Sequence, residues 1–240
     1  MSSAANERKI LLKKLKIKKI DEALLNEALT HPSFNFERNI ENAPDYERLE
    51  FLGDSVLRLS LSDYLFRKYP DYNEGKLTKI RSYLVSDACL AKIAVSLDLG
   101  RYLNMGIHES KDGGREKDSI LACSMEAILG AIYTDSGFDK ANEVIYNLYS
   151  SIDIDINNIL ISYNPKEILQ QYTQGLNKDL PVYKTVSESG PAHKKMYEIA
   201  VIYQNKEIGR GIAPTKKEAE KKAALNALCE LNIKEEKLNG

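Results

Sequence analysis

The spacing of hydrophobic residues changes near residue 164, and this change divides the 240-residue chain into two parts. Before it, apolar residues recur with a helical period in segments 20–30, 45–68, 74–97, 119–133 and 138–150. After it, a helical segment is followed by three short segments of strand-like alternation and by a long helix that opens at Pro214-Thr215. We therefore predict an all-α domain followed by a small α+β domain with the order α-β-β-β-α.

The same change of pattern sets the predicted domain limits. We place the first domain at residues 1–155, a linker at 156–163 and the second domain at 164–234. Residues 1–163 hold 21 basic and 25 acidic side chains, a balance of −4, whereas residues 164–240 hold 13 and 10, a balance of +3. This asymmetry indicates that the two domains have different partners. Two polar stretches in the first part are predicted to be loops, at 33–45 and 108–117.

Several classes of protein are excluded by what the chain lacks. No run of about 18 uncharged apolar residues occurs, so no membrane span is predicted. The N-terminal sequence has no apolar run followed by a small-residue cleavage site, so we expect a cytoplasmic protein. Its three cysteines are far apart and form no CxxC pair, which argues against a disulfide framework or a cysteine zinc site.

A group of acidic residues is the main candidate for chemistry in the first part. Glu47, Glu50 and Asp54 are spaced i, i+3 and i+7, which places three carboxylates on one face of a helix. Such a cluster suits Mg²⁺ or Mn²⁺, although an ordinary solvated helix face explains the spacing equally well. Glu126 favours the metal site, because it lies inside the apolar segment 119–133, where an unpaired carboxylate is unfavourable.

Four blocks of sequence then carry a family resemblance. They read HPSF (31–34), YERLEFLGDSVL (46–57), EGKLTKIRSYLVS (74–86) and GGREKDSILACSMEAILGAIYTDSG (113–137). In content, order and spacing they resemble the catalytic domain of the ribonuclease III family. The resemblance implies an all-helical endonuclease that forms homodimers and cuts double-stranded RNA with Mg²⁺.

The resemblance also implies a role for individual residues. Glu50, Asp54 and Glu126 match metal-ligating carboxylates, and of these Asp54 and Glu126 match the catalytic ones. Glu47 and Glu74 match acidic residues that support the site or help to place the RNA. Phe51 matches an apolar residue at the dimer contact.

One position departs from the family pattern. The family usually has an aspartate ligand three residues before the position of Glu126, and here that position holds Cys123. A thiol is a soft ligand that suits Mg²⁺ poorly. The departure predicts weaker metal binding, a water in place of the missing oxygen, or a preference for Mn²⁺. For Cys123 itself we favour the role of a small, buried and inert side chain.

The second part carries a basic helix and a polar loop. Lys216 and Lys217 lie in the first turn of the last helix, and Lys217 shares a face with Lys221. Alone, these lysines would describe an ordinary solvated helix. Together with Gln170, Gln174 and the loop GPAHKK (190–195), residues 164–233 resemble the double-stranded RNA-binding domain. The resemblance implies minor-groove contacts for Gln170, Gln174 and His193 and phosphate contacts for Lys216, Lys217 and Lys221.

The sequence therefore predicts a homodimeric, Mg²⁺-dependent endoribonuclease specific for double-stranded RNA, with Mn²⁺ as the other metal considered. By the resemblance, it would leave 5′-phosphate and 3′-hydroxyl ends and process precursor ribosomal RNA and other structured RNAs. The alternative is a double-stranded RNA-binding protein whose catalytic site is weakened or lost at Cys123. The retention of Glu50, Asp54 and Glu126 favours the enzyme.

Overall fold

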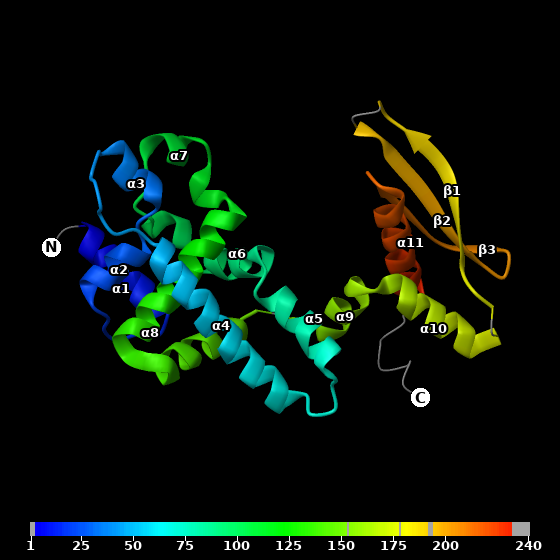
Figure 1. Ribbon diagram of the computed structural model, residues 1–240, viewed down its shortest axis with the longest axis horizontal. Helices are drawn as coiled ribbons and strands as arrows, with labels where there is room; N and C mark the ends of the chain where they lie inside the picture. The colour runs from blue at the N-terminus through cyan, green and yellow to red at the C-terminus, as the bar shows by residue number, and fades with distance from the viewer. Residues whose placement is uncertain (1–2, 153, 178, 192–193, 232–240) are drawn as a thin grey trace. The chain divides into compact units, whose positions relative to one another are not determined.

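A computed structural model of the chain describes residues 3–152, 154–177, 179–191 and 194–231. It divides into two compact units, residues 1–154 and 155–240. The first unit is helical, and the second combines helices with one antiparallel sheet (Figure 1). This arrangement confirms the predicted fold class.

The helical elements of the first unit follow one another in the order α1 (Ser3–Lys14), α2 (Glu22–Ala28), α3 (Pro32–Glu37), α4 (Glu47–Lys68), α5 (Glu74–Leu84), α6 (Asp87–Ser96), η1 (Leu99–Tyr102), α7 (Ile107–Lys111), η2 (Gly114–Glu116) and α8 (Asp118–Tyr149). The η elements are single turns of 3₁₀-helix. Within α8, Gly137 has φ 78° and ψ 179°, which separates the two helical segments that the sequence predicts there.

Helices α4 and α8 cross at the centre of the first unit (Figure 1), and two glycines make the crossing possible. A Cβ atom at Gly53 of α4 would lie 1.8 Å from the backbone oxygen of Glu126, and one at Gly130 of α8 would lie 2.1 Å from that of Leu49. The two backbones are therefore in direct contact. Around the crossing, both helices bury apolar side chains completely, among them Leu57, Leu61, Leu121, Met125 and Ile128.

The predicted loops at 33–45 and 108–117 are wrong in part, because each contains a short helix. In α3, Pro32 occupies the first turn and Nδ1 of His31 accepts the backbone N–H of Ser33. In α7, the carboxylate of Glu37 accepts the N–H groups of Ile107 and His108, at 2.6 and 2.9 Å. Helix α7 is thus capped by a residue 70 positions earlier in the chain, and a local pattern does not show such a contact.

The second unit consists of α9 (Ile156–Tyr163), α10 (Pro165–Asn177), β1 (Val182–Ser189), β2 (Met196–Tyr203), β3 (Lys206–Ala213) and α11 (Lys216–Glu230). The segment predicted as a linker forms α9, and its Ile161 joins the core of this unit. The sheet is antiparallel with the order β1-β2-β3, and α11 lies against it (Figure 1). Contact is close because Gly209 and Gly211 leave no Cβ between β3 and the backbone of α11.

Register along β1 and β2 shifts once. Thr185 pairs with Ile199, whereas Ser187 pairs with Glu198, so Val186 is an extra residue on β1. Side chains alternate between the faces of a sheet, and one extra residue therefore reverses the facing of the rest of β1. As a result Glu188, rather than Ser187, lies opposite Tyr197.

No helix among the described residues has the length and apolar character needed to cross a lipid bilayer.

We predict that Gly53→Ala destabilises the first unit by about 2–4 kcal/mol, because the new methyl group forces α4 and α8 apart. Gly75→Ala on α5 is the matched control, since its Cβ would lie 3.5 Å from Oδ1 of Asn73, an ordinary van der Waals contact. Urea unfolding of both variants measures the effect. Equal free energies of unfolding for Gly53→Ala and the unmodified chain would show that the helices do not meet at this glycine.

Candidate functional site

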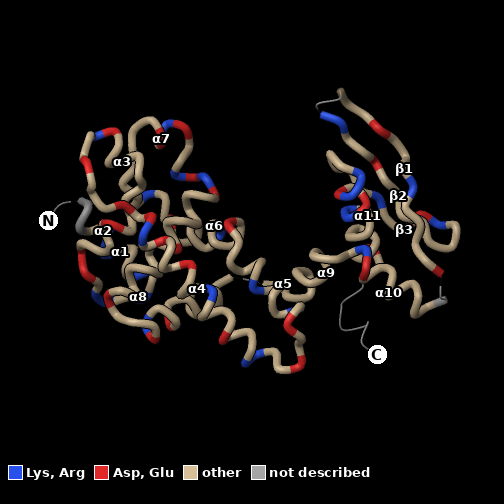
Figure 2. The backbone as a smooth tube through the Cα atoms, viewed as in Figure 1, with Lys and Arg blue, Asp and Glu red and all other residues tan. Residues whose placement is uncertain are grey.

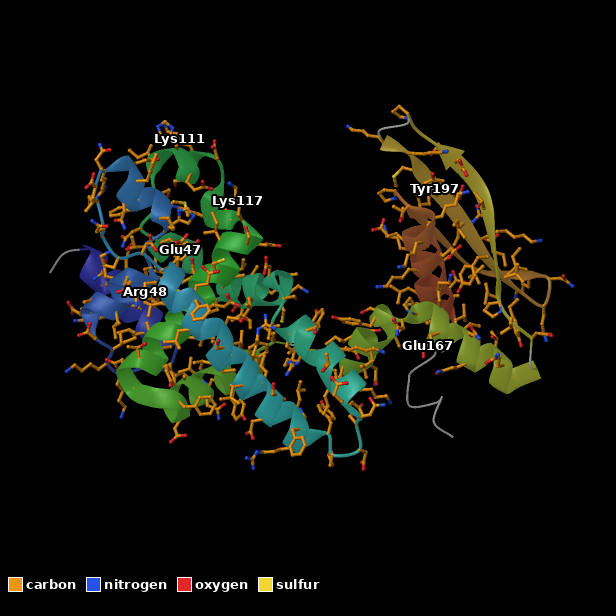
Figure 3. The ribbon with its side chains drawn as sticks, viewed as in Figure 1. Glu47, Arg48, Lys111, Lys117, Glu167 and Tyr197 are labelled. Atoms are coloured by element: carbon orange, nitrogen blue, oxygen red, sulfur yellow. The ribbon has the colours of Figure 1, made fainter. Side chains whose placement is uncertain are left out.

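The first half of α4 presents the acidic residues that the sequence singles out. Glu47 is exposed in the first turn, where a carboxylate is favoured by the helix dipole (Figure 3). Glu50 and Asp54 are half-buried and flank Gly53, the residue at which α4 meets α8. The helix therefore holds these two carboxylates beside the crossing and Glu47 at its solvent-facing end.

Glu126 lies on α8, and its backbone oxygen is the atom nearest to Gly53 of α4. Its side chain is half-buried. Burial, together with the negative charges of Asp54 and Glu50, raises the pKa of this carboxyl to about 8, while Arg58 acts in the opposite direction. The two helices thus bring Glu50, Asp54 and Glu126 close enough for their charges to oppose one another, as the sequence predicts for a shared site.

Asp54 has a cationic partner. Nε of Arg58, one turn further along α4, donates to both carboxylate oxygens of Asp54, at 2.7 and 2.8 Å. This pair raises the pKa of the Arg58 guanidinium. Both side chains are partly exposed, so the ion pair is readily exchanged for another charge partner.

Cys123 lies one turn before Glu126 and is half-buried. Its pKa is raised to about 12 by burial, by a hydrogen bond with Glu50 and by the charges of Glu50, Glu126 and Asp87. The thiol is therefore protonated at neutral pH and is a donor to Glu50 rather than a thiolate ligand.

Sequence reasoning missed Asp87. It is the first residue of α6, after the N-cap Ser86, and it is exposed. Its negative charge raises the pKa of both Cys123 and Glu126, so it belongs to the same electrostatic neighbourhood. In the sequence Asp87 looks like an ordinary acidic residue in the first turn of a helix, and only the packing of α6 against α8 relates it to Glu126.

Glu74 and Phe51 lie on another part of the first unit's surface. Glu74 is exposed at the start of α5, where it accepts a hydrogen bond from Thr78 and lines an open hollow of about 640 Å³ between α4 and α5. On α4, the side chains of Phe51, Leu59 and Phe66 are 78 %, 58 % and 73 % exposed. The structure therefore offers an apolar stripe and a hollow beside it.

The donor atoms at the α4–α8 crossing suit a hard cation. Within the described residues, no group of three or more acidic, histidine or cysteine side chains is arranged so that it could hold a metal ion. The available groups are nevertheless carboxylate oxygens from two helices, and burial and the charges of Asp54 and Glu50 raise the pKa of Glu126. Oxygen ligands that leave room for water are those that Mg²⁺ prefers, and Mn²⁺ accepts them as well.

The predicted RNA contacts of the second unit lie on three elements. Gln170 and Gln174 are exposed on α10, and basic side chains gather in the first turns of α11 (Figure 2). Lys216 is ion-paired with Glu188, whereas Lys217 and Lys221 have no ion pair among the described residues. The third element is the loop between β1 and β2, whose His193 lies outside the described residues.

Both units match known families. Residues 21–152 match the model of a ribonuclease-III-like family, and residues 165–231 match that of the double-stranded RNA binding motif. Ribonuclease 3 of Desulforamulus reducens is 42 % identical over 231 residues, which cover 96 % of this chain and 94 % of that protein. Ribonuclease 3 of Campylobacter jejuni is 43 % identical over 211 residues, which cover 88 % and 92 %.

Solved structures also resemble this chain. Among them is the nuclease domain of ribonuclease III from Campylobacter jejuni, with 42 % identity and a TM-score of 0.55. The match covers 59 % of this chain and 95 % of that one. The structure is described as flexible in the region of that domain involved in dimer formation.

The raised pKa of Glu126 predicts how stability changes with pH when no metal is bound. Between pH 4.5, where an ordinary glutamate ionises, and about 8, the folded chain keeps a proton that the unfolded chain has released. The free energy of unfolding therefore falls as the pH rises through this range. Glu126→Gln removes this loss, so the stability of the variant relative to the unmodified chain should rise from pH 4 to pH 9.

Urea unfolding in chelator across that range measures the difference. Glu41→Gln is the control, because this exposed carboxyl lies in the connection between α3 and α4. A relative stability of Glu126→Gln that is constant with pH would contradict the raised pKa.

Proposed function

The chain belongs to the ribonuclease III family, and we propose that it is an endoribonuclease that cuts double-stranded RNA. The observation that carries the proposal is the crossing of α4 and α8, which joins Glu50, Asp54 and Glu126 into one electrostatic group. A separate unit that matches the double-stranded RNA binding motif supplies the means to hold a duplex. A binding protein with a lost catalytic site is not favoured, since Glu50, Asp54 and Glu126 are retained and the charges of the first two act on the third.

We propose that Glu50, Asp54 and Glu126 hold Mg²⁺, or Mn²⁺ in its place. When bound, such a cation supplies an acidified water and positive charge for the phosphate that is cut. Asp54 has to exchange Arg58 for this partner, and their exposed ion pair permits that. Glu126 has to lose its proton, which a neighbouring positive charge favours by lowering its pKa. The products are a 5′-phosphate and a 3′-hydroxyl.

In this proposal Cys123 does not ligate the metal. Its protonated thiol donates to Glu50 and so orients that carboxylate. Glu47 and Glu74 are exposed acidic residues with a supporting role at the site or in placing the RNA. A water would take the place of the aspartate oxygen that the family usually supplies there.

We propose that the second unit recognises the shape of A-form RNA. Gln170, Gln174 and His193 would contact the minor groove, and the lysines of α11 at 216, 217 and 221 would contact phosphates across the major groove. Support comes from the match to the double-stranded RNA binding motif and from the exposure of the glutamines and lysines. Cellular substrates would include precursor ribosomal RNA in the cytoplasm, and loss of the protein should then cause unprocessed precursors to accumulate on RNA blots.

We further propose that two copies of the chain associate through the exposed stripe of Phe51, Leu59 and Phe66. A surface with three exposed large apolar side chains on one helix is typical of an interface. The hollow between α4 and α5 offers space for an apolar side chain of a second copy. The related nuclease domain has a region involved in dimer formation, which agrees with this proposal.

Phe51→Asp should convert the dimer to a monomer, because a charge in the interface would lose its water without gaining a partner. Sedimentation velocity measures the mass in solution. Val95→Asp, at another exposed apolar position on α6, should leave the dimer intact. Equal masses for the two variants would show that Phe51 lies outside the interface.

Glu126→Gln should abolish cutting of long duplex RNA, by at least about 100-fold in rate, while duplex binding is kept. The amide preserves the shape of the side chain but removes the charge that holds a cation. Cleavage is followed on gels with Mg²⁺, with Mn²⁺ and with chelator, and binding is measured by gel shift. Normal cutting by the variant would show that Glu126 is not part of the site. If the unmodified chain left the RNA intact in every condition, the proposal that it is an endoribonuclease would be wrong.

Cys123→Asp should lower the metal concentration needed for half-maximal cutting, and more so for Mg²⁺ than for Mn²⁺. The change supplies an oxygen ligand one turn from Glu126, and hard oxygen donors favour Mg²⁺. Cys123→Ser is the matched control, because it keeps a neutral donor of similar size. Coinciding metal curves for the aspartate and serine variants would show that position 123 does not face the cation.

A further inference from the structure

Two lysines of the second unit are held by the same pair of side chains. Nζ of Lys195 lies 2.5 Å from Oε2 of Glu188, and Nζ of Lys216 lies 2.9 Å from Oε1 of the same carboxylate. Both ammonium groups also lie over the ring of Tyr197, at 5.2 and 5.3 Å from its centroid. We call this arrangement of Glu188, Tyr197, Lys195 and Lys216 the lysine clamp.

The register of the sheet creates the clamp. Glu188 and Tyr197 are directly opposite each other on β1 and β2 (Figure 3 labels Tyr197), so their side chains share a face. That is the face covered by α11, because Tyr197 packs against a buried cluster formed by Ile199, Ala213 and the α11 residue Ala219. The extra residue Val186 places Glu188 on this face. A carboxylate and a fixed aromatic ring therefore meet beside the start of α11.

The two lysines come from different elements. Lys195 ends the loop between β1 and β2, and Lys216 is the first residue of α11, after the N-cap Thr215. A lysine at the start of a helix is opposed by the helix dipole, and the carboxylate of Glu188 offsets that repulsion. The clamp thus ties the loop to the helix by a shared anion and a shared ring.

Stability does not explain the clamp well. Glu188, Lys195 and Lys216 have side chains that are 35 %, 42 % and 55 % exposed, and ion pairs with such exposure contribute little to folding. The clamp also keeps a net positive charge, since one carboxylate faces two ammonium groups. This remaining positive charge still attracts phosphate oxygens, whereas a clamp with no net charge would not.

We propose that Glu188 and Tyr197 are positioning residues that fix the distance between Lys195 and Lys216. Lys195, at the end of the loop, and the first turn of α11 then meet a duplex at a fixed spacing. This inference rests on the proposed function, in which the loop enters the minor groove and α11 spans the major groove. Because groove widths differ between A-form and B-form duplexes, a fixed distance favours RNA over DNA.

The test measures binding of the full chain, in chelator to prevent cutting, to an RNA duplex and a DNA duplex of the same sequence. Each duplex has about 20 base pairs, which exceeds the roughly 16 that such a domain spans. Fluorescence anisotropy gives the two affinities. Glu188→Gln and Tyr197→Leu should each weaken RNA binding about fivefold and change DNA binding little, so the preference for RNA falls.

Two variants serve as controls. Tyr197→Phe keeps the ring and should keep the preference for RNA. Lys217→Ala removes a phosphate contact outside the clamp and should weaken RNA and DNA binding by similar factors. Thermal unfolding of every variant checks folding, and Glu188→Gln, on the surface, serves if Tyr197→Leu does not fold.

The proposal is overturned if Glu188→Gln binds RNA as tightly as the unmodified chain or more tightly, since the carboxylate would then only compete with phosphate. It is also overturned if Tyr197→Phe loses as much preference as Tyr197→Leu. In both cases the unmodified chain still prefers RNA, so the proposed function stands. An unmodified chain with no preference for the RNA duplex would instead refute the proposed function of the second unit together with this inference.

Discussion

The direct contact between the backbones of α4 and α8 determines what the first unit can do. Gly53 and Gly130 remove the side chains that would keep these helices apart, and each lies against a backbone oxygen of the other helix. The charges of Glu50 and Asp54 therefore act on Glu126 and contribute to its raised pKa. Close helix packing, which usually serves stability, here also sets the distance between the acidic groups.

That placement is electrostatically unfavourable until a positive charge is present. Glu126 is half-buried next to two other carboxylates, and its pKa is raised to about 8 as a consequence. Two neighbouring side chains partly offset this negative charge. Arg58 donates a hydrogen bond to Asp54, and the protonated thiol of Cys123 donates one to Glu50. Neither partner neutralises Glu126. Under the proposal, a divalent cation would offset this unfavourable charge, and the chain is less stable without one.

The sequence predicts much of this arrangement but not the contacts between distant segments. The spacing of Glu47, Glu50 and Asp54 gives their common helix, and the apolar surroundings of Glu126 mark it as unusual. The role of Asp87 and the helices α3 and α7 were not predicted, because each depends on packing or capping between residues far apart in the chain. The clamp at Glu188 was not predicted for another reason. One extra residue, Val186, places Glu188 on the opposite face of the sheet from the one that simple alternation predicts.

The central claim is that carboxylates from α4 and α8 form a single cation site. Anomalous scattering from crystals of the full chain grown with Mn²⁺ tests it most directly, because the signal locates the metal without reference to activity. We expect a manganese peak in contact with carboxylate oxygens of Glu126 and of at least one of Glu50 and Asp54. A peak bound by one helix alone, or no peak near the crossing at saturating Mn²⁺, would contradict it.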